Sequence, residues 1–381
     1  MPLKQIAILL LMTGALTSFA TETNAGTATA AAEPGPSEQC RFIGIHDFSG
    51  FAIERSSNSN AGEEVLVSPV LKAPIDWDQL VVSWNAQTPP GAWLKVEVKG
   101  LYPDHETKFF TMGVWSSDAA LHPRGSVRHQ HDDDGRVNDD TLLLERPGAD
   151  LQLRLTLGGT DSTSAPKLKF VGLSFLDSRV HPDPLPANHA VWGKIIATTE
   201  RSQHSYAEEK GWCSPTSLSM VLTRWGELLH RPELEADVPV VAAGVYDPVF
   251  GGTGNWPFNT AYAGGFPGMR AYVARFSDIS ELEDWIAAGI PVIISAPWHL
   301  LSPGREDTGS GHLTVCIGFT ETGDVVINDP ATNLQKGQKV RHIYKRENVI
   351  NAWKQSKNTV YLVYPETAQI PADRFGHWDK P

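Results

Sequence analysis

Basic clusters, long apolar segments and cysteines are all scarce in this sequence of 381 residues. No run of Lys or Arg stands out, and 32 basic against 44 acidic residues give a formal net charge of -12, which disfavours nucleic acids and anionic membranes as partners. No apolar stretch is long enough to cross a bilayer. The three cysteines form an odd set, so at least one thiol is free or pairs with another molecule.

The first residues indicate export. Lys4 precedes an apolar run over residues 6–16, and small residues follow up to Ala20 and Ala25, which predicts a cleavable signal peptide over residues 1–25. The Ala-, Thr-, Gly- and Pro-rich segment 26–39 predicts a flexible leader. We therefore expect a soluble, secreted protein with its thiols in an oxidising compartment.

Such a compartment makes the fate of the three thiols informative. A Cys40–Cys316 disulfide and three free thiols are both compatible with the sequence. A cysteine kept free outside the cytoplasm favours a catalytic role.

Residues 40–178 carry short strand-like runs separated by Gly, Pro, Asn and Asp, with no convincing helix between them. This pattern predicts an all-β sandwich, jelly-roll-like, as an accessory domain. Its tryptophans Trp84, Trp93 and Trp115 either fill the core or stack on sugar rings, so a glycan or cell-wall ligand is one expectation for this domain. The strand-like runs lie at 80–84, 93–98, 108–112, 151–157 and 168–173.

The acidic segment 129–140 in this domain resembles a metal loop only at first sight. Placing Gly135 at the glycine position of an EF-hand puts Gln130 at the first ligand position and Thr141 where a bidentate Glu is required. No Cys or third His lies near His129 and His131 to complete a zinc site. We interpret the segment as a turn with solvated carboxylates, and we expect no metal.

A proline-rich segment, 179–189, predicts the boundary between two domains. The second domain, 190–366, is expected to be α+β because a helix comes first and an antiparallel sheet follows; residues 367–381 form a tail. We expect helices at 215–225, 280–289 and 346–354 and strands at 291–296, 313–319, 325–328 and 359–364. A Ser-x-x-Glu capping box is expected to start the second helix at Ser280.

The segment 211–222 places Cys213 where a loop turns into a helix. Ser214 suits the N-cap and Pro215 the first helical position, and apolar residues then repeat at helical spacing until Gly226. The N–H groups and dipole at a helix N-terminus favour a thiolate, which is a nucleophile near neutral pH. The alternative is a small buried cysteine that helps pack the helix.

His312 and Asp329 are the expected partners of this cysteine. His312 precedes the strand at 313–319, and a hairpin turn at 321–324 returns the chain to Asp329 at the end of the next strand. Cysteine, histidine and aspartate would then serve as nucleophile, base and orienting group. Taken singly, His312 is also compatible with an ordinary strand-end histidine and Asp329 with a turn residue.

The surroundings of Cys213, His312 and Asn328-Asp329-Pro330 resemble the papain-like cysteine peptidases of family C39, the bacteriocin-processing peptidases, and most closely their secreted C39-like branch. The resemblance covers residues 190–366 and implies a papain-like fold with Cys213 as nucleophile, His312 as base and Asp329 as orienting residue. It also implies that Gln203 helps the Cys213 N–H to form the oxyanion hole.

The resemblance includes the aromatic stretch 252–261, which either lines the substrate groove or packs beneath the helix of Cys213. We predict substrate contacts from Trp212, Asn255 and Trp256. The sequence contains no transporter segments or nucleotide-binding motifs, so a leader-cleaving role coupled to transport is not implied.

The sequence therefore predicts a secreted cysteine peptidase that hydrolyses peptide or related amide bonds through an acyl-enzyme, with no cofactor. Its partner would be a peptide or protein substrate. Papain-like cell-wall amidases and acyl or amide transferases use the same order of residues and are alternatives. An exported glycan-binding or adhesion protein with an inactive peptidase-like domain is the alternative outside enzymes.

Overall fold

The computed structural model describes residues 39–54, 63–159, 165–207, 211–302, 304 and 311–376. The predicted signal peptide and most of the predicted leader lie outside these residues. All described residues belong to one compact unit, Gly35–Pro381. Within them, no helix is long and apolar enough to cross a membrane.

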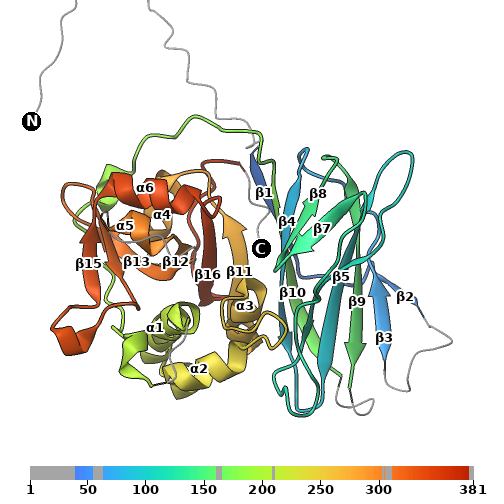
Figure 1. The fold of residues 1–381 in the computed structure, drawn as a ribbon, viewed down its shortest axis with the longest axis horizontal. Helices are drawn as coiled ribbons and strands as arrows, with labels where there is room; N and C mark the ends of the chain where they lie inside the picture. Colours follow the sequence, from blue (N-terminus) through green and yellow to red (C-terminus); the bar gives the residue numbers. More distant parts are fainter. Residues whose placement is uncertain are drawn as a thin grey trace, which may run out of the picture. The chain divides into compact units, whose positions relative to one another are not determined.

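The first domain is a sandwich of two five-stranded sheets, which confirms the predicted all-β architecture (Figure 1). In β9 the leucines at alternate positions face the core between the sheets and polar residues lie between them. One antiparallel sheet has the order β1 (Cys40–Ile45), β10 (Lys167–Leu176), β4 (Gln79–Gln87), β8 (Thr141–Leu144) and β7 (Gly135–Asn138). The other has the order β2 (Ala52–Glu54), β3 (Glu64–Val67), β9 (Asp150–Gly158), β5 (Trp93–Leu101) and β6 (Phe110–Trp115).

The second domain has the expected α+β composition and is built on one six-stranded antiparallel sheet. Its strand order is β11 (Met269–Arg275), β16 (Thr359–Pro365), β12 (Val292–Ser295), β13 (Leu313–Phe319), β14 (Val325–Asn328) and β15 (Arg341–Tyr344). Its helices are α1 (Cys213–Leu229), α2 (Val238–Val245), α3 (Trp256–Gly265), α4 (Ile279–Ala287), α5 (Trp298–Leu301) and α6 (Arg346–Lys354). Helix α1 packs on β13 and β16, and α4 packs on β12 and β13 (Figure 1).

Helix α1 differs from its predicted bounds at both ends. It begins at Cys213, with Trp212 and not Ser214 at the N-cap, and it continues past Gly226 to Leu229. His230 then ends the helix in the left-handed conformation. Gly226 is a packing position and not a stop, because a Cβ there would lie 2.6 Å from Cγ of Glu235.

Helix α4 is also capped differently from the prediction. Asp278 is its N-cap, and its side chain accepts a hydrogen bond from Ser280 N, so the capping box expected at Ser280 is wrong. Glu283, the presumed fourth residue of that box, accepts from Trp192 Nε1 at 2.8 Å and from Arg346 Nη1 at 2.6 Å. These bonds tie α4 to the segment before α1 and to α6.

The two domains share a continuous packed interface. Phe258 of α3 lies edge-on to Trp84 and Trp115, with ring centroids 6.1 and 5.3 Å apart, and it belongs to the core of the sandwich. Trp84 and Trp115 are therefore core residues, so of the two alternatives left open by the sequence, core filling holds for both. Trp93 is half-buried and stacks on His122, with the two ring centroids 4.7 Å apart.

The buried side chain of Asn85 in β4 bonds the two domains together. Its Nδ2 donates to the carbonyl of Ala271 in β11 at 2.6 Å, and its Oδ1 accepts from Ala271 N at 3.1 Å. Helix α3 approaches so closely that a Cβ on Gly264 would lie 2.0 Å from Asn85 Nδ2. The sandwich and the second domain are thus joined by side chain–backbone hydrogen bonds as well as by apolar surface.

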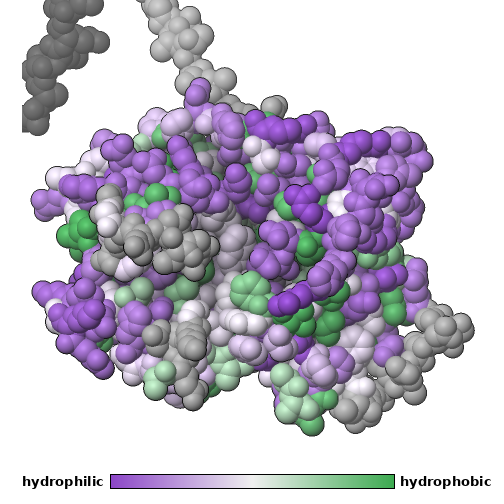
Figure 2. Space-filling view, in the orientation of Figure 1, coloured by the Kyte–Doolittle hydropathy of each residue, from purple (hydrophilic) through white to green (hydrophobic). Residues whose placement is uncertain are grey.

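The outer surface in view is mostly hydrophilic, with hydrophobic residues in separate patches (Figure 2). Several large hydrophobic side chains are nevertheless exposed, as is usual for folded proteins. They include Ile53, Leu121, Leu229, Tyr246, Phe250 and Ile343.

We expect Asn85→Ala to lower the free energy of unfolding by about 2–4 kcal/mol, because it leaves the buried N–H and C=O of Ala271 without partners. Urea denaturation followed by circular dichroism measures the loss. Asn138→Ala, at an exposed position of β7, is the matched control and should change the value by less than about 0.5 kcal/mol. Equal effects of the two substitutions would show that the Asn85 bonds do not hold the domains together.

Candidate active site

Cys213 is the first residue of α1, so its thiol lies at the positive end of the helix dipole. The side chain is half-buried. Burial alone would raise the pKa of the Cys213 thiol, but the adjoining ring of His312 and the N–H groups of Leu313 and Ser214 lower it below its ordinary value. The site therefore favours a thiolate.

His312 directly precedes β13 and pairs with Asp329, which directly follows β14. Nε2 of the buried His312 lies 2.9 Å from Oδ1 of Asp329. Because Nε2 faces the carboxylate, Nδ1 is the ring nitrogen left to face the thiol of Cys213. Burial would lower the pKa of His312, yet the charge of Asp329 and the contact with Cys213 raise it well above its ordinary value.

The carboxylate of Asp329 is held by three donors. Besides the imidazole, it accepts hydrogen bonds from the Tyr344 hydroxyl at 2.6 Å and from Ala331 N at 2.9 Å. Burial would raise the pKa of Asp329, but these donors and the imidazole keep it well below its ordinary value. Asp329 is thus a fixed negative charge behind the His312 ring.

Helix α1 is fixed against the strand that carries the histidine. Ser217, one turn after Cys213, donates its hydroxyl to the carbonyl of Leu313 at 3.0 Å. The carbonyl of His312 itself accepts from Ala296 N at 2.7 Å. Sequence reasoning missed Ser217 and Tyr344, although the spacing of four residues from Cys213 to Ser217 could have placed both on one face of the helix.

Gln203 lies in a short 3-10 helix, Gln203–Ser205, and is buried. Its backbone N donates to the carbonyl of Pro330 at 2.9 Å. This bond places the Gln203 segment beside the turn that carries Asp329. The four predicted catalytic residues therefore come from segments that adjoin one another.

The three predicted substrate-contact residues differ in what their side chains do. Trp212 is the half-buried N-cap of α1, and Trp256 is the half-buried first residue of α3. The side chain of Asn255 is buried and used within the fold, because Oδ1 caps α3 at Phe258 N and Nδ2 donates to Asp247 Oδ2 at 3.0 Å. Asn255 is thus placed as a structural residue of this loop.

No disulfide joins Cys40, Cys213 and Cys316, all of which lie in the described part of the chain. The open alternative of a Cys40–Cys316 bridge is therefore not realised. Cys40 Sγ lies 3.6 Å from Ser277 Oγ. Cys316 is buried in the middle of β13, where burial raises the pKa of its thiol to about 12, so it is a packing residue.

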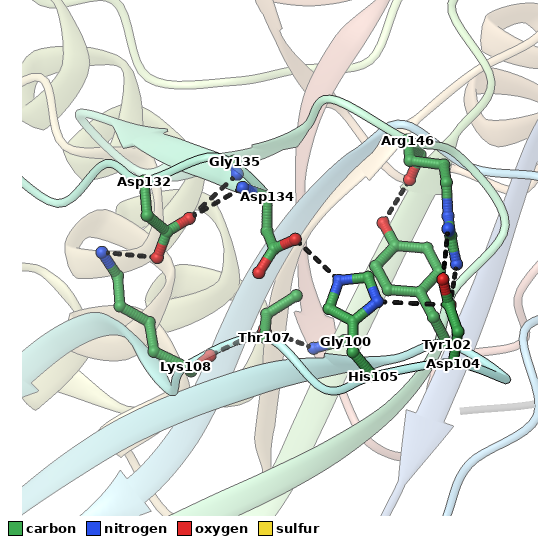
Figure 3. Close-up of polar contacts among 10 residues, drawn as sticks. All are labelled: Gly100, Tyr102, Asp104, His105, Thr107, Lys108, Asp132, Asp134, Gly135 and Arg146. Atoms are coloured by element: carbon green, nitrogen blue, oxygen red, sulfur yellow. Dashed lines mark hydrogen bonds and ion pairs between the residues drawn. The ribbon is translucent and has the colours of Figure 1, made fainter.

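The acidic segment 129–140 consists of a bend at residues 133–134, strand β7 and a turn at residues 139–140, and local contacts stabilise the bend (Figure 3). Asp132 accepts from the N–H groups of Asp134 and Gly135, each at 3.1 Å, and pairs with Lys108 at 2.8 Å. Asp134 pairs with His105 Nε2 at 2.7 Å. Among described residues, no group of three or more His, Cys, Asp or Glu is arranged to hold a metal ion.

In this α+β domain, a cysteine at the start of a helix adjoins a histidine and an aspartate at the ends of two paired strands. That arrangement is typical of papain-like proteins. The model of the Peptidase_C39-like family matches residues 195–361, and that of the Peptidase C39 N-terminal domain matches residues 55–175. Both regions thus match models of C39 peptidases, which confirms the resemblance seen in the sequence and supports a cysteine-peptidase kind of function.

Other comparisons add little. No curated protein matches the chain. A solved structure of a Bacillus anthracis protein, provisionally described as a C39-like peptidase, covers 49% of this chain and 100% of its own at 19% identity and a TM-score of 0.32. That similarity is too low to support an argument.

We expect Asp329→Asn to slow iodoacetamide labelling of Cys213 at pH 6 by at least about tenfold. A rise of one unit in the pKa of Cys213 lowers the thiolate fraction by about that factor. The Asp329 carboxylate raises the pKa of His312, and the resulting imidazolium lowers the pKa of Cys213. Removing the carboxylate charge therefore raises the pKa of Cys213. Labelling is measured by intact mass between pH 5 and 9.

Asp324→Asn is the matched control for this substitution. Asp324 lies at the turn between β13 and β14 and pairs with exposed Lys345 at 2.8 Å, so its charge acts on a different cation. Labelling of this variant should follow the wild-type pH profile. A wild-type profile for Asp329→Asn would contradict the electrostatic link from Asp329 to Cys213.

Proposed function

We propose that this protein is a cysteine peptidase that cleaves peptide bonds through a Cys213–His312–Asp329 triad. The observation that carries the proposal is the position of the His312 ring, which meets the carboxylate of Asp329 on one side and the thiol of Cys213 on the other. The match of residues 195–361 to the Peptidase_C39-like family model supports the same kind of reaction.

In the proposed acylation, the Cys213 thiolate attacks the carbonyl carbon of the substrate and a tetrahedral oxyanion forms. The imidazolium of His312 then gives its proton to the amide nitrogen, the C–N bond breaks, and the amine leaves from a thioester on Cys213. Asp329 stabilises the imidazolium and fixes its orientation throughout.

Deacylation reverses these roles with water in place of the amine. Neutral His312 takes a proton from water as the water oxygen attacks the thioester carbonyl. Collapse of the second tetrahedral intermediate releases the carboxylic acid and restores the thiolate with the imidazolium. In both steps the oxyanion would accept hydrogen bonds from the Gln203 side chain and the Cys213 N–H.

We further propose export, on the strength of the signal-like sequence at residues 1–25. Peptides and peptidoglycan fragments should be assayed together, because a cell-wall amidase or an acyl or amide transferase would use the same triad. Hydrolysis of peptides alone supports the peptidase. Turnover of peptidoglycan fragments alone would replace it with the amidase.

We expect Cys213→Ala to lower peptide hydrolysis by at least about 10³-fold without unfolding the protein, because it removes the nucleophile and leaves the packing nearly unchanged. Hydrolysis is measured on a fluorogenic peptide library, and folding by near-ultraviolet circular dichroism. Cys316→Ala is the matched cysteine control and should keep most of the activity. Equal losses in the two folded variants would rule out Cys213 as the nucleophile.

We expect Gln203→Ala to lower kcat by about 10²–10³-fold, the usual effect of losing one oxyanion donor. The rate of iodoacetamide labelling should not change, because alkylation forms no oxyanion. Gln338→Ala, in the loop after Asp329, is the control and should leave kcat unaltered. An unchanged kcat in Gln203→Ala would remove Gln203 from the oxyanion hole.

A further inference from the structure

The loop between α2 and α3, residues 246–255, is organised around one buried carboxylate, and we call it the Asp247 loop. Asp247 accepts hydrogen bonds from Val249 N at 2.9 Å, Phe250 N at 3.1 Å and Asn255 Nδ2 at 3.0 Å. Its backbone N also donates to the carbonyl of Gly252 at 2.9 Å. These bonds fold the loop back on itself.

The sandwich domain supplies further donors to this loop. Ser126 N donates to the Asp247 carboxylate, at 3.2 and 3.1 Å from its two oxygens. The buried Arg124 donates from Nε to the carbonyl of Tyr246 at 2.9 Å and from Nη2 to the carbonyl of Ala243. Gly125 lies between Arg124 and Ser126 in the chain, and a Cβ on it would lie 2.8 Å from Cγ2 of Val249. The two domains are therefore in close contact here.

Arg124 is itself fixed within the sandwich. Its Nη1 donates to the carbonyl of Ser116 at 3.0 Å, and its guanidinium lies 5.4 Å from the ring centroid of Trp115. A planar group with five donors can bond carbonyls of both domains at once. The position of the Asp247 loop is therefore set by the sandwich as well as by its own carboxylate.

The other end of the loop reaches the segment of the nucleophile. Thr253 Oγ1 donates to the carbonyl of Gly211, two residues before Cys213, at 3.0 Å. Asn259 Nδ2 in α3 fixes the Thr253 carbonyl at 2.8 Å. A third sandwich residue, the buried Asp140, accepts from Trp256 N at 2.8 Å just beyond the loop.

The Asp247 loop also presents an aromatic side chain to solvent. Phe250 is 38% exposed, and its ring lies against the backbone of Gly252 and Gly254, where added Cβ atoms would be 3.2 and 3.5 Å away. Glycine at both positions leaves room for the ring across the loop. An exposed aromatic on a fixed loop bonded to the nucleophile segment is suited to contact a substrate.

We propose that the sandwich domain, through Arg124, positions the Asp247 loop as one wall of the substrate groove, and that Phe250 on this wall favours an apolar side chain of the peptide. This inference rests on the proposed function. Arg124 is a positioning residue, since it acts through the loop. Phe250 is the residue that touches substrate.

The test compares alkylation of Cys213 by two peptidyl chloromethyl ketones, acetyl-Leu-Gly and acetyl-Asp-Gly, with alkylation by iodoacetamide. Intact mass gives the second-order rate for each reagent on the full-length protein. We expect the leucyl reagent to react at least about tenfold faster than the aspartyl one, as an apolar contact allows. Phe250→Ala should reduce that ratio about fivefold and leave the iodoacetamide rate unchanged.

Arg124→Met should reduce the ratio in the same way, because Tyr246 in the loop and Ala243 in α2 each lose a donor and the loop loses its fixed position. Arg128→Met, at an exposed position four residues further on, is the matched control and should keep the wild-type ratio. If Arg124→Met does not fold, Arg124→Lys tests the same point, because one ammonium cannot replace the guanidinium at all three carbonyls.

If Phe250→Ala leaves the ratio of the leucyl to the aspartyl alkylation rate unchanged, the proposed contact between Phe250 and substrate is overturned. A ratio that falls with Phe250→Ala but not with either Arg124 variant overturns the role of the sandwich. Failure of the peptidase proposal looks different: wild type hydrolyses no peptide, while the alkylation ratios still respond to Phe250 and Arg124 and support the groove wall.

Discussion

The imidazole of His312 lies between a half-buried thiol and a buried carboxylate, and the candidate chemistry depends on that arrangement. Burial by itself opposes charge on all three groups. Each group is charged because a neighbour of opposite charge adjoins it, and for Cys213 and Asp329 because N–H and hydroxyl donors stabilise the anion as well. The sulfur can thus be a nucleophile, and the ring a proton donor, over the same range of pH.

This arrangement needs precise positions, and the hydrogen bonds around it supply them. The Tyr344 hydroxyl and Ala331 N hold Asp329, while Ser217 ties the first turn of α1 to the carbonyl of Leu313, beside His312. A displacement of about 1 Å between nucleophile and base is enough to cost a large part of the rate. Much of the polar bonding near the site therefore serves geometry.

The sequence anticipated the elements that carry the chemistry better than those that surround it. The β13–β14 hairpin and helix α6 lie at their predicted positions, because apolar residues repeat there at strand and helix spacing. Helix α2 was not predicted, because its valine-rich sequence has no polar face. Strand β15 was not predicted either, because apolar and polar residues do not alternate clearly along this short, mostly exposed strand. The predicted start of α1 lay two residues too late, because the helix begins at Cys213 itself. The Ser214 hydroxyl does not cap the helix and lies 3.0 Å from the Tyr361 hydroxyl.

By itself, the sequence determined which side chains are able to react and which strands and helices present them, because reactivity and local periodicity are properties of short segments. Only the tertiary structure decided that the sandwich is bonded to the second domain. Asn85 and Ala271 are 186 positions apart, and Arg124 and Tyr246 are 122 apart. No local pattern records such pairs, since they form only when two separately folded sheets and their loops bury the same surface.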